Sequence, residues 1–263
     1  MPKQRLDQLL VDRGLAPSRA AAQAMLLAGE VELAGGATRN LKPGQMVPDD
    51  ARLTVRQRPR WASRAGDKLV AALDAFGVDP AGLACLDAGA STGGFTDVLL
   101  ARGARVVYAV DVGRGQLIDR LRREPKVVSM ERINLRELAS LPEPVSLATL
   151  DLSFISLRLV LPAVRRLLAP EGRVVALVKP QFEAGREAVP RGGVVRDPQV
   201  HRDVLAAFAA DAAAAGFRPA GLIRSPLAGT DGNVEFLALL GPPPGVAETA
   251  WSELVAAVTE ASA

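Results

Sequence analysis

Apolar residues near the N-terminus recur with the spacing of two short helices. Leucines in the segment 6–10 share one helical face that ends at Gly14, and a Pro-Ser entry opens a second helical stretch over residues 17–29. Two short runs, at residues 31–33 and 53–55, read as strands separated by glycine and proline turns. The pattern predicts a small α+β domain.

From residue 83 onward, short and nearly continuous apolar runs alternate with helical stretches. The runs are rich in Val and Leu, as in strands that are covered on both faces. They are LACLDAG, RVVYAVDVG, VVSM, LATLDLSF, RVVALVKP, FRPAGLI and VEFLALL. The last two lie close together, which favours an antiparallel edge pair. The pattern therefore predicts an α/β fold with a Rossmann-like, mainly parallel sheet of seven strands.

The positive charge of the chain is concentrated in its first quarter. Of 263 residues, 49% are hydrophobic, enough for one full α/β domain and a smaller module. The net charge is +3, but residues 1–66 carry 11 Lys and Arg against 6 Asp and Glu, and the other 197 residues carry 21 against 23. This asymmetry favours a polyanion-binding module joined to a nearly neutral, enzyme-sized domain, with an ordinary basic surface as the alternative.

We divide the chain into a small domain (1–58), a basic linker (59–66) and a large domain (67–263). Arginines run through the junction, and no acidic residue interrupts them before Asp67: Arg52, Arg56, Arg58, Arg60 and Arg64. Such a stretch is either a solvated linker or a basic strip that continues the polyanion-binding surface. We favour the strip, and assign Arg60 and Arg64 to it, because Trp61 offers an aromatic surface that a linker does not need.

The counts of cysteine and histidine exclude several kinds of site. Cys85 is the only cysteine and lies in an apolar run, which excludes a disulfide framework and indicates a reducing, intracellular setting. His201 is the only histidine, so a zinc site with several imidazole ligands is impossible, and we expect no metal. We place His201 at a helix start, facing solvent, without a role.

Apolar runs in the chain are all far shorter than the ~18–20 residues of a membrane span, and the N-terminus lacks the apolar core of a signal peptide. We therefore expect a cytoplasmic protein without membrane contact.

The first strand of the large domain runs into a glycine-rich turn, DAGASTGGFT, at residues 87–96. Glycines there let the backbone approach a ligand closely, and the following helix start supplies free amide donors. Asp111, at the end of the next strand, is placed to accept hydrogen bonds from ribose hydroxyls. The missing G-x-G-x-x-G, and an acid just before the glycines, favour S-adenosylmethionine over a dinucleotide; a turn that binds no ligand is the alternative. The predicted cofactor-binding residues are Asp87, Gly89, Ala90, Ser91, Gly93, Gly94, Phe95, Asp111 and Val112.

Charged residues stand where the pattern predicts core. Asp151 follows the run SLATL, Lys179 follows VVALV, and Glu235 precedes FLALL. Because the carboxyl ends of strands face the ligand crevice in an open α/β sheet, we expect these side chains to lie together beside the cofactor. A charge at such a position is costly unless it is paired. The alternative is a buried ion pair that serves stability alone.

The small domain resembles an S4 RNA-binding domain over residues 3–57. The resemblance rests on Arg5-Leu6-Asp7, on the Ser18-Arg19 pair that opens the second helix, and on Gly29 and Val31. In that family a basic face of the two helices contacts RNA phosphates, which implies Lys3, Arg5 and Arg19 as RNA contacts. The chain departs from the pattern at Asn40, where the family often has a basic residue.

Four ionisable residues extend the resemblance to nearly the whole chain, residues 3 to about 241. Lys68 in SRAGDKL, Asp151 in LDLSFISL, Lys179 in LVKPQFE and Glu235 in GNVEFL look like the Lys-Asp-Lys-Glu tetrad of the FtsJ-like 2′-O-methyltransferases. Joined to an S4 domain, the tetrad resembles the haemolysin-A-like TlyA family, whose members methylate cytidines of rRNA in the small and often also the large ribosomal subunit. The resemblance implies S-adenosylmethionine as cofactor and ribosomal RNA as partner, and leaves the oligomeric state open.

A ribose 2′-hydroxyl must lose its proton as it attacks a methyl group. Our hypothesis is that Lys179 contacts that hydroxyl and favours its ionised form, or accepts its proton if burial favours the neutral amine. Asp151 and Glu235 would orient and balance the two lysines. Lys68 would position the ribose or stabilise developing negative charge, although Asp67 beside it could alter its charge state.

Three rival functions stay open. A non-catalytic RNA-binding protein would need the small domain but not the charges at strand ends. A membrane-active haemolysin, suggested only by the family's name, would need a spanning or strongly amphipathic segment that the sequence lacks. A dinucleotide oxidoreductase would need the motif G-x-G-x-x-G.

Overall fold

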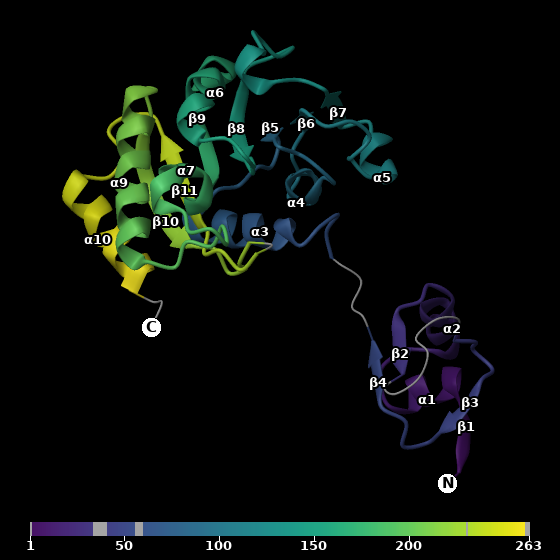
Figure 1. Ribbon diagram of the computed structural model, residues 1–263. Helices are drawn as coiled ribbons and strands as arrows, with labels where there is room; N and C mark the ends of the chain where they lie inside the picture. The colour runs from purple at the N-terminus through teal and green to yellow at the C-terminus, as the bar shows by residue number, and fades with distance from the viewer. Residues whose placement is uncertain (1, 34–40, 56–59, 230, 261–263) are drawn as a thin grey trace. The chain divides into compact units, whose positions relative to one another are not determined.

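The chain divides into two units, Met1–Pro59 and Arg60–Ala263 (Figure 1). The computed structural model describes residues 2–33, 41–55, 60–229 and 231–260. Asn40, and Arg56 and Arg58 of the predicted basic strip, lie outside the described residues. Residues 60–66 of the predicted linker are part of the second unit.

The first unit has the two helices and the strand pair that the pattern predicts. Its elements are β1 (Lys3–Arg5), α1 (Leu6–Asp12), α2 (Arg19–Leu27), β2 (Val31–Leu33), β3 (Met46–Pro48) and β4 (Leu53–Val55). Ser18 caps α2, since its Oγ accepts a hydrogen bond from the Ala21 N–H at 3.2 Å. β2 pairs antiparallel with β4, and β1 pairs antiparallel with β3. The pattern missed β1 because Lys-Gln-Arg contains no apolar residue, and it missed β3 because Met-Val-Pro ends in a proline, which is typical of a turn.

The core of the first unit is small and aliphatic. It consists of Leu6, Leu9, Leu10, Ala16, Ala22, Leu26, Val31 and Val47. One charged side chain, Asp7, is fully buried beside these residues.

The second unit begins with a helix and continues as alternating strands and helices. Its elements are α3 (Ala65–Phe76), β5 (Ala84–Ala88), α4 (Gly94–Ala101), β6 (Val106–Asp111), α5 (Asp119–Arg122), β7 (Val127–Glu131), the 3₁₀ turn η1 (Leu135–Glu137), β8 (Val145–Leu150), the 3₁₀ turn η2 (Leu157–Leu159), α6 (Leu161–Leu167), β9 (Leu168–Val178), α7 (Pro180–Glu183), α8 (Gly185–Ala188), α9 (Pro198–Ala214), β10 (Arg218–Arg224), β11 (Phe236–Gly241) and α10 (Glu248–Glu260).

The strands of the second unit form one seven-stranded sheet in the order β10-β11-β9-β8-β5-β6-β7. Neighbours from β9 through β7 run parallel, whereas β11 runs antiparallel to both β9 and β10. The prediction of a mainly parallel sheet with an antiparallel last pair is confirmed. β11 nevertheless lies inside the sheet, and β10 alone of that pair is at the edge.

Helices cover both faces of this sheet (Figure 1). α3 and α4 pack on one face against strand residues such as Cys85 and Leu177. α6, α9 and α10 pack on the other face against the intervening residues, such as Leu86 and Ala176. Because successive side chains of one strand enter opposite cores, both must be apolar, which accounts for the continuous apolar runs in the sequence.

His201 lies inside the second of these cores rather than in solvent. α9 begins after Asp197, whose side chain accepts a hydrogen bond from the Gln199 N–H at 2.8 Å, so the predicted helix start is confirmed. His201 itself is fully buried, with Nε2 3.1 Å from the Val195 carbonyl oxygen and its ring edge-on to Phe236 at 5.4 Å. The prediction of a solvent-facing histidine was wrong because a helix start in the sequence does not say which side of the first turn packs on the sheet.

The topology gathers the ends of several strands at one edge. β5 has β6 on one side and β8 on the other, so the chain leaves β5 at the point where the strand order reverses and a crevice opens. β8 and β9 end at the same edge because they run parallel to β5. β11 starts there because it is antiparallel, with Phe236 paired to Val178.

Candidate active site

Four ionisable side chains meet at this edge. Asp151 follows β8, Lys179 follows β9, and Glu235 immediately precedes β11. Lys68 comes from the first turn of α3, 167 residues before Glu235. The structure thus brings together all four residues that the sequence singled out for their charge.

The four side chains form two largely buried ion pairs. Lys179 Nζ lies 2.7 Å from Asp151 Oδ1 and donates a hydrogen bond to Ser153 Oγ at 3.0 Å. Lys68 Nζ pairs with Glu235 Oε2. Pairing offsets part of the cost of removing both charges of each pair from water. Lys68 and Glu235 are 7% and 3% exposed, whereas Lys179 and Asp151 are 10% and 19% exposed, so the second pair is the more accessible to a substrate.

A small cavity of about 280 Å³ opens beside these pairs. All four ionisable residues line it, together with the glycine-rich turn and Arg64. A large cavity of about 520 Å³ adjoins it, since both are lined by Gly89, Ser91, Asp151 and Ser153. A ligand in the large cavity can therefore present a group to the ion pairs.

Gly89 lets the ends of β5 and β8 lie against each other. Its φ is +82°, and a Cβ there would lie 2.4 Å from the carbonyl oxygen of Asp151. A backbone atom cannot yield as a flexible side chain can, so only glycine fits. Gly93, which we also predicted to bind cofactor, lines neither cavity; a Cβ there would meet the side chains of Leu117 and Leu121.

Asp111 joins the glycine-rich turn to the loop after β6. Its Oδ2 accepts a hydrogen bond from the Ser91 N–H at 2.8 Å, and its Oδ1 accepts one from the Gly113 N–H at 2.7 Å. A carboxylate has about four acceptor positions, so these two bonds leave others free for ligand hydroxyls. Asp111 and Val112 line the large cavity, and Ala90, Gly94 and Phe95 line the small one.

Asp87 is buried beneath the glycine-rich turn and lines neither cavity. The Thr96 hydroxyl donates a hydrogen bond to Asp87 Oδ2 at 2.6 Å, and Thr149 Oγ1 lies 3.3 Å from Oδ1. Burial raises the pKa of Asp87 to about 7, against the opposing effect of the Thr96 hydrogen bond. From this position Asp87 supports the glycine-rich turn through its contacts with Thr96 and Thr149.

Asp87→Asn is expected to flatten the pH dependence of folding stability. Because folding raises the pKa of Asp87 from 3.8 to about 7, the folded state favours the neutral acid. The contribution of Asp87 to folding stability is fully present below its pKa in the unfolded chain and is lost as the pH rises through its pKa in the folded protein. Asparagine has no such proton and keeps an oxygen for Thr96. The free energy of unfolding, measured by denaturant titration, should differ less between about pH 5 and about pH 8 for the variant than for the wild type. An equal difference for the two proteins would contradict the raised pKa of Asp87.

The sequence did not point to Phe154, whose ring lies at the mouth of the large cavity. The residue is 91% exposed and its φ is +63°, a left-handed conformation that is uncommon for a bulky residue. Its ring centroid lies 5.2 Å from that of Phe182, and the two rings line a further hollow beside the site. In a sequence an exposed phenylalanine reads like a core one, and the only signal was its position three residues after Asp151.

The loop that carries Phe154 is fastened to α7. The Glu183 carboxylate accepts hydrogen bonds from the Ser156 hydroxyl at 2.6 Å and from the Leu157 N–H at 2.9 Å. Burial raises the pKa of Glu183, and these hydrogen bonds oppose the rise. Together with the pair of Asp151 and Lys179, Glu183 attaches the loop at both ends.

Trp61 is part of the core and does not provide the exposed aromatic surface that we expected. It is 8% exposed and packs on Gly66, where a Cβ would lie 2.4 Å from its Cγ. Its Nε1–H donates a hydrogen bond to Asp67 at 3.1 Å, so Asp67 contacts Trp61 while Lys68 pairs with Glu235. Charged residues that flank an aromatic residue in the sequence do not reveal whether a nearby glycine leaves room to bury the ring. Arg60 and Arg64 are exposed, and the Arg60 guanidinium lies 4.8 Å from the Trp61 ring centroid.

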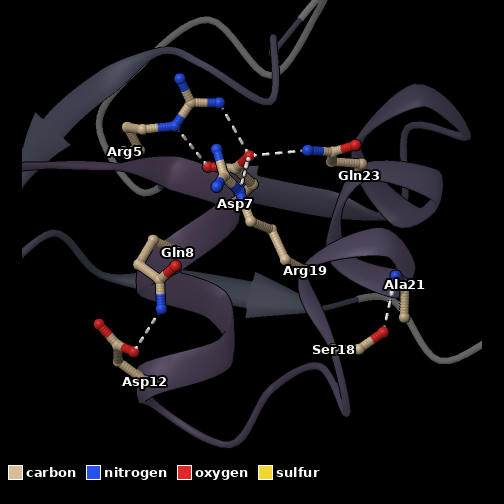
Figure 2. Close-up of polar contacts among 8 residues, drawn as sticks. All are labelled: Arg5, Asp7, Gln8, Asp12, Ser18, Arg19, Ala21 and Gln23. Atoms are coloured by element: carbon tan, nitrogen blue, oxygen red, sulfur yellow. Dashed lines mark hydrogen bonds and ion pairs between the residues drawn. The ribbon is translucent and has the colours of Figure 1, made fainter.

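Lys3, Arg5 and Arg19 are exposed on the first unit. Arg5 and Arg19 both form ion pairs with the buried Asp7, at 2.9 and 3.0 Å (Figure 2). The structure therefore brings two of the three predicted RNA contacts together.

Among the described residues, no helix is both long and apolar enough to cross a membrane. Within the same ranges, no three His, Cys, Asp or Glu side chains gather closely enough to hold a metal ion.

Comparisons of the sequence and of the structure with known proteins agree on one family. The model of the FtsJ-like methyltransferase family matches residues 61–241. The 16S/23S rRNA (cytidine-2′-O)-methyltransferase TlyA of Mycobacterium tuberculosis is 48% identical over 238 residues, which cover 88% of this chain and 87% of that protein. Hemolysin A of Brachyspira hyodysenteriae is 38% identical over 237 residues, 89% of this chain and 98% of the relative. A Streptococcus thermophilus structure described as a candidate hemolysin has a TM-score of 0.74 and 43% identity, and the match covers 99% of this chain and 97% of that one.

Proposed function

The chain belongs to the FtsJ-like methyltransferase family, among relatives named TlyA and hemolysin A, and from that membership we propose that it methylates a ribose 2′-hydroxyl of ribosomal RNA. One observation carries the proposal: the two ion pairs line a small cavity that shares Gly89 and Asp151 with the large one. This arrangement suits a methyl donor held in one cavity and a hydroxyl held in the other.

The large cavity suits S-adenosylmethionine, the cofactor of this family. Val110, Ile133 and Leu135 contribute apolar surface for a flat adenine ring, and Asp111 can accept hydrogen bonds from the ribose hydroxyls. Gly89 lies where the cavities join and leaves room for the reacting part of the molecule. When bound, the cofactor supplies an electrophilic methyl group on a positively charged sulfur.

Lys179 is the residue that we assign to the 2′-hydroxyl. In the reaction the 2′-oxygen forms a bond to the methyl carbon, the carbon–sulfur bond breaks, and the hydroxyl proton leaves. Lys179 stabilises the negative charge that develops on the oxygen, or takes up its proton. Asp151 and Ser153 hold the Lys179 amine in place, at 2.7 and 3.0 Å. Lys68, held by Glu235, lines the same cavity and positions the ribose.

The exposed basic residues of both units are our candidates for gripping RNA. Lys and Arg that neutralise phosphates dominate the affinity for nucleic acid. Residues 1–66 hold the positive excess of the chain, which supports Lys3, Arg5 and Arg19 in this role. Arg60 and Arg64 stand at the start of the second unit, and Arg64 lines the small cavity.

More specifically, we propose that the substrate is a cytidine in the RNA of one or both ribosomal subunits, as the name of the Mycobacterium tuberculosis relative states for that protein. The test is transfer of a labelled methyl group from S-adenosylmethionine to purified 30S and 50S subunits that lack the modification, followed by nuclease mapping. Label on a cytidine 2′-oxygen of either subunit is the expected result. No label on either, despite measurable cofactor binding, would overturn the ribosomal substrate.

Phe154→Ala is expected to raise the KM for ribosomal subunits about tenfold, a larger effect than on the Kd for the cofactor, whose cavity the ring borders at its mouth. An exposed aromatic ring at the mouth of the site offers a face on which an RNA base can stack, and such stacking contributes ~1–3 kcal/mol per base. Leu159→Ala, which trims another exposed apolar side chain shortly after the same loop, is the control. Equal KM values for the two variants would show that the Phe154 ring does not contact the substrate.

A further inference from the structure

Asp7 is a buried anion on the unit with the greatest excess of positive charge. Its side chain is fully buried in the first turn of α1, and four hydrogen bonds converge on it (Figure 2). Arg5 donates from Nε at 3.0 Å and from Nη2 at 2.9 Å, which is a bidentate contact. Arg19 Nε and Gln23 Nε2 each donate to Oδ2 at 3.0 Å.

These hydrogen bonds keep Asp7 ionised. The hydrogen bond from Arg5 holds the pKa of Asp7 well below its ordinary value, with Gln23 and Arg19 adding to the effect and burial opposing it. The carboxylate is therefore a permanent negative charge between two permanent positive ones.

The arginines themselves remain open to solvent. The side chains of Arg5 and Arg19 are 45% and 51% exposed. Because Arg5 Nη2 and Arg19 Nε bond the same oxygen of Asp7, the two guanidinium groups lie side by side. Each guanidinium has five N–H donors in a planar fork, so the bonds to Asp7 leave outward-facing donors on both.

We propose that Asp7 is a positioning residue that holds Arg5 and Arg19 together as a preformed clamp for phosphate groups of the RNA backbone. Two guanidinium groups this close repel each other, and Asp7 offsets that repulsion. Each long side chain would otherwise lose rotamer freedom on binding RNA, a loss that the fixed position removes in advance. The inference rests on the proposed function, because it presumes that the first unit grips RNA.

The proposal makes a prediction opposite to that of net charge. Asp7→Asn removes a negative charge, and charge alone predicts tighter binding of a polyanion. The asparagine amide, however, can accept with only one atom and presents N–H donors to the donors of Arg5 and Arg19. If Asp7 positions the arginines, the variant binds RNA about fivefold to tenfold more weakly, since each freed side chain regains its rotamers.

Asp12→Asn is the matched control. Asp12 is exposed on the same helix and accepts hydrogen bonds from Gln4 and Gln8, so its substitution removes the same charge without freeing an arginine. The measurement is the Kd of the full chain for a fluorescently labelled RNA stem-loop, titrated at several salt concentrations. We expect Asp12→Asn to bind as tightly as the wild type or more tightly, and Asp7→Asn to bind more weakly. Wild-type or tighter binding by Asp7→Asn overturns the proposal.

The double variant Arg5→Ala/Arg19→Ala separates this inference from the function on which it rests. Wild-type binding by the double variant would show that the first unit does not grip RNA through these residues, and both ideas would fall. Weak binding by the double variant with wild-type binding by Asp7→Asn would remove the positioning role alone.

A thermal melt followed by circular dichroism tells whether Asp7→Asn keeps the first unit folded. If it does not, Arg19→Lys decides instead, because it keeps the charge and leaves Asp7 bonded to Arg5 and Gln23. A lysine cannot present a planar fork while it pairs with Asp7. Severalfold weaker binding by Arg19→Lys is then the expected result, and wild-type affinity refutes the clamp.

Discussion

Lys179→Ala is expected to lower kcat for methyl transfer by about a thousandfold or more, with the affinities for cofactor and RNA within about twofold of wild type. Removing a group that stabilises developing charge typically costs a factor of ~10²–10³, and loss of a proton acceptor costs a similar factor. Lys179 is the amine of the more accessible ion pair and lines the small cavity. Single-turnover rates with subunits lacking the modification, alongside separate binding titrations, make the measurement.

Controls are needed because alanine also leaves Asp151 without its partner. The double variant Lys179→Met/Asp151→Asn removes both charges and keeps both side-chain volumes, so it should melt near the wild type and remain inactive. Lys126→Ala, which trims an exposed lysine at the opposite end of the parallel strands, should retain wild-type turnover. Wild-type turnover by Lys179→Ala with normal binding would refute the proposed mechanism.

Gly89→Ala is expected to weaken cofactor binding by about a hundredfold, a loss of ~2.7 kcal/mol. The added Cβ would lie 2.4 Å from the Asp151 carbonyl oxygen, so the ends of β5 and β8 must separate. That movement distorts the wall common to both cavities and draws Asp151 away from Lys179. Isothermal titration with S-adenosylmethionine measures the first effect, and kcat at saturating cofactor measures the second.

Gly82→Ala separates the steric effect from backbone strain. Gly82 also has a positive φ, +74°, but a Cβ there would meet nothing within 4 Å. Both substitutions force alanine into the left-handed region, which costs ~1–2 kcal/mol of stability. We expect both variants to melt earlier and Gly89→Ala alone to lose cofactor affinity. Equal cofactor affinity for the two variants would contradict the role of Gly89 at the join of the cavities.

The seven-stranded sheet could be predicted because its strands are covered on both faces. Continuous apolar runs leave little choice of environment, and their order along the chain implies parallel neighbours. The insertion of β11 between β9 and β10 could not be read in this way, since a strand at the edge and one inside the sheet have similar runs when helices cover both faces.

The four ionisable residues of the candidate site could be predicted, but the ion pairs that they form could not. A charge at the end of an apolar run is conspicuous, and strand ends converge in this class of fold. Which carboxylate meets which lysine depends on the depth of α3 and on the register of β11, and the structure pairs Lys68 with Glu235 rather than with its neighbour Asp67. Residues without charge at the site, Ser153 and Phe154, gave no signal of comparable strength.

Burial of single aromatic residues was the main source of error. His201 and Trp61 both lie in polar stretches of sequence, and both are buried in the structure. Each is accommodated by a local feature, Gly66 beneath the Trp61 ring and the Val195 carbonyl beside the His201 ring. Such features depend on which segments meet after folding, which hydrophobic periodicity does not encode.

The long sequence separation of Lys68 and Glu235 makes completion of the site a late event in synthesis. The two residues are 167 positions apart, and Glu235 precedes β11, which follows the other strands of the sheet in the chain. Until β11 has left the ribosome, Lys68 lacks its partner Glu235, and β10 lacks the neighbour that joins it to the sheet. A nascent chain therefore holds an incomplete site until at least 167 residues beyond Lys68 have been translated.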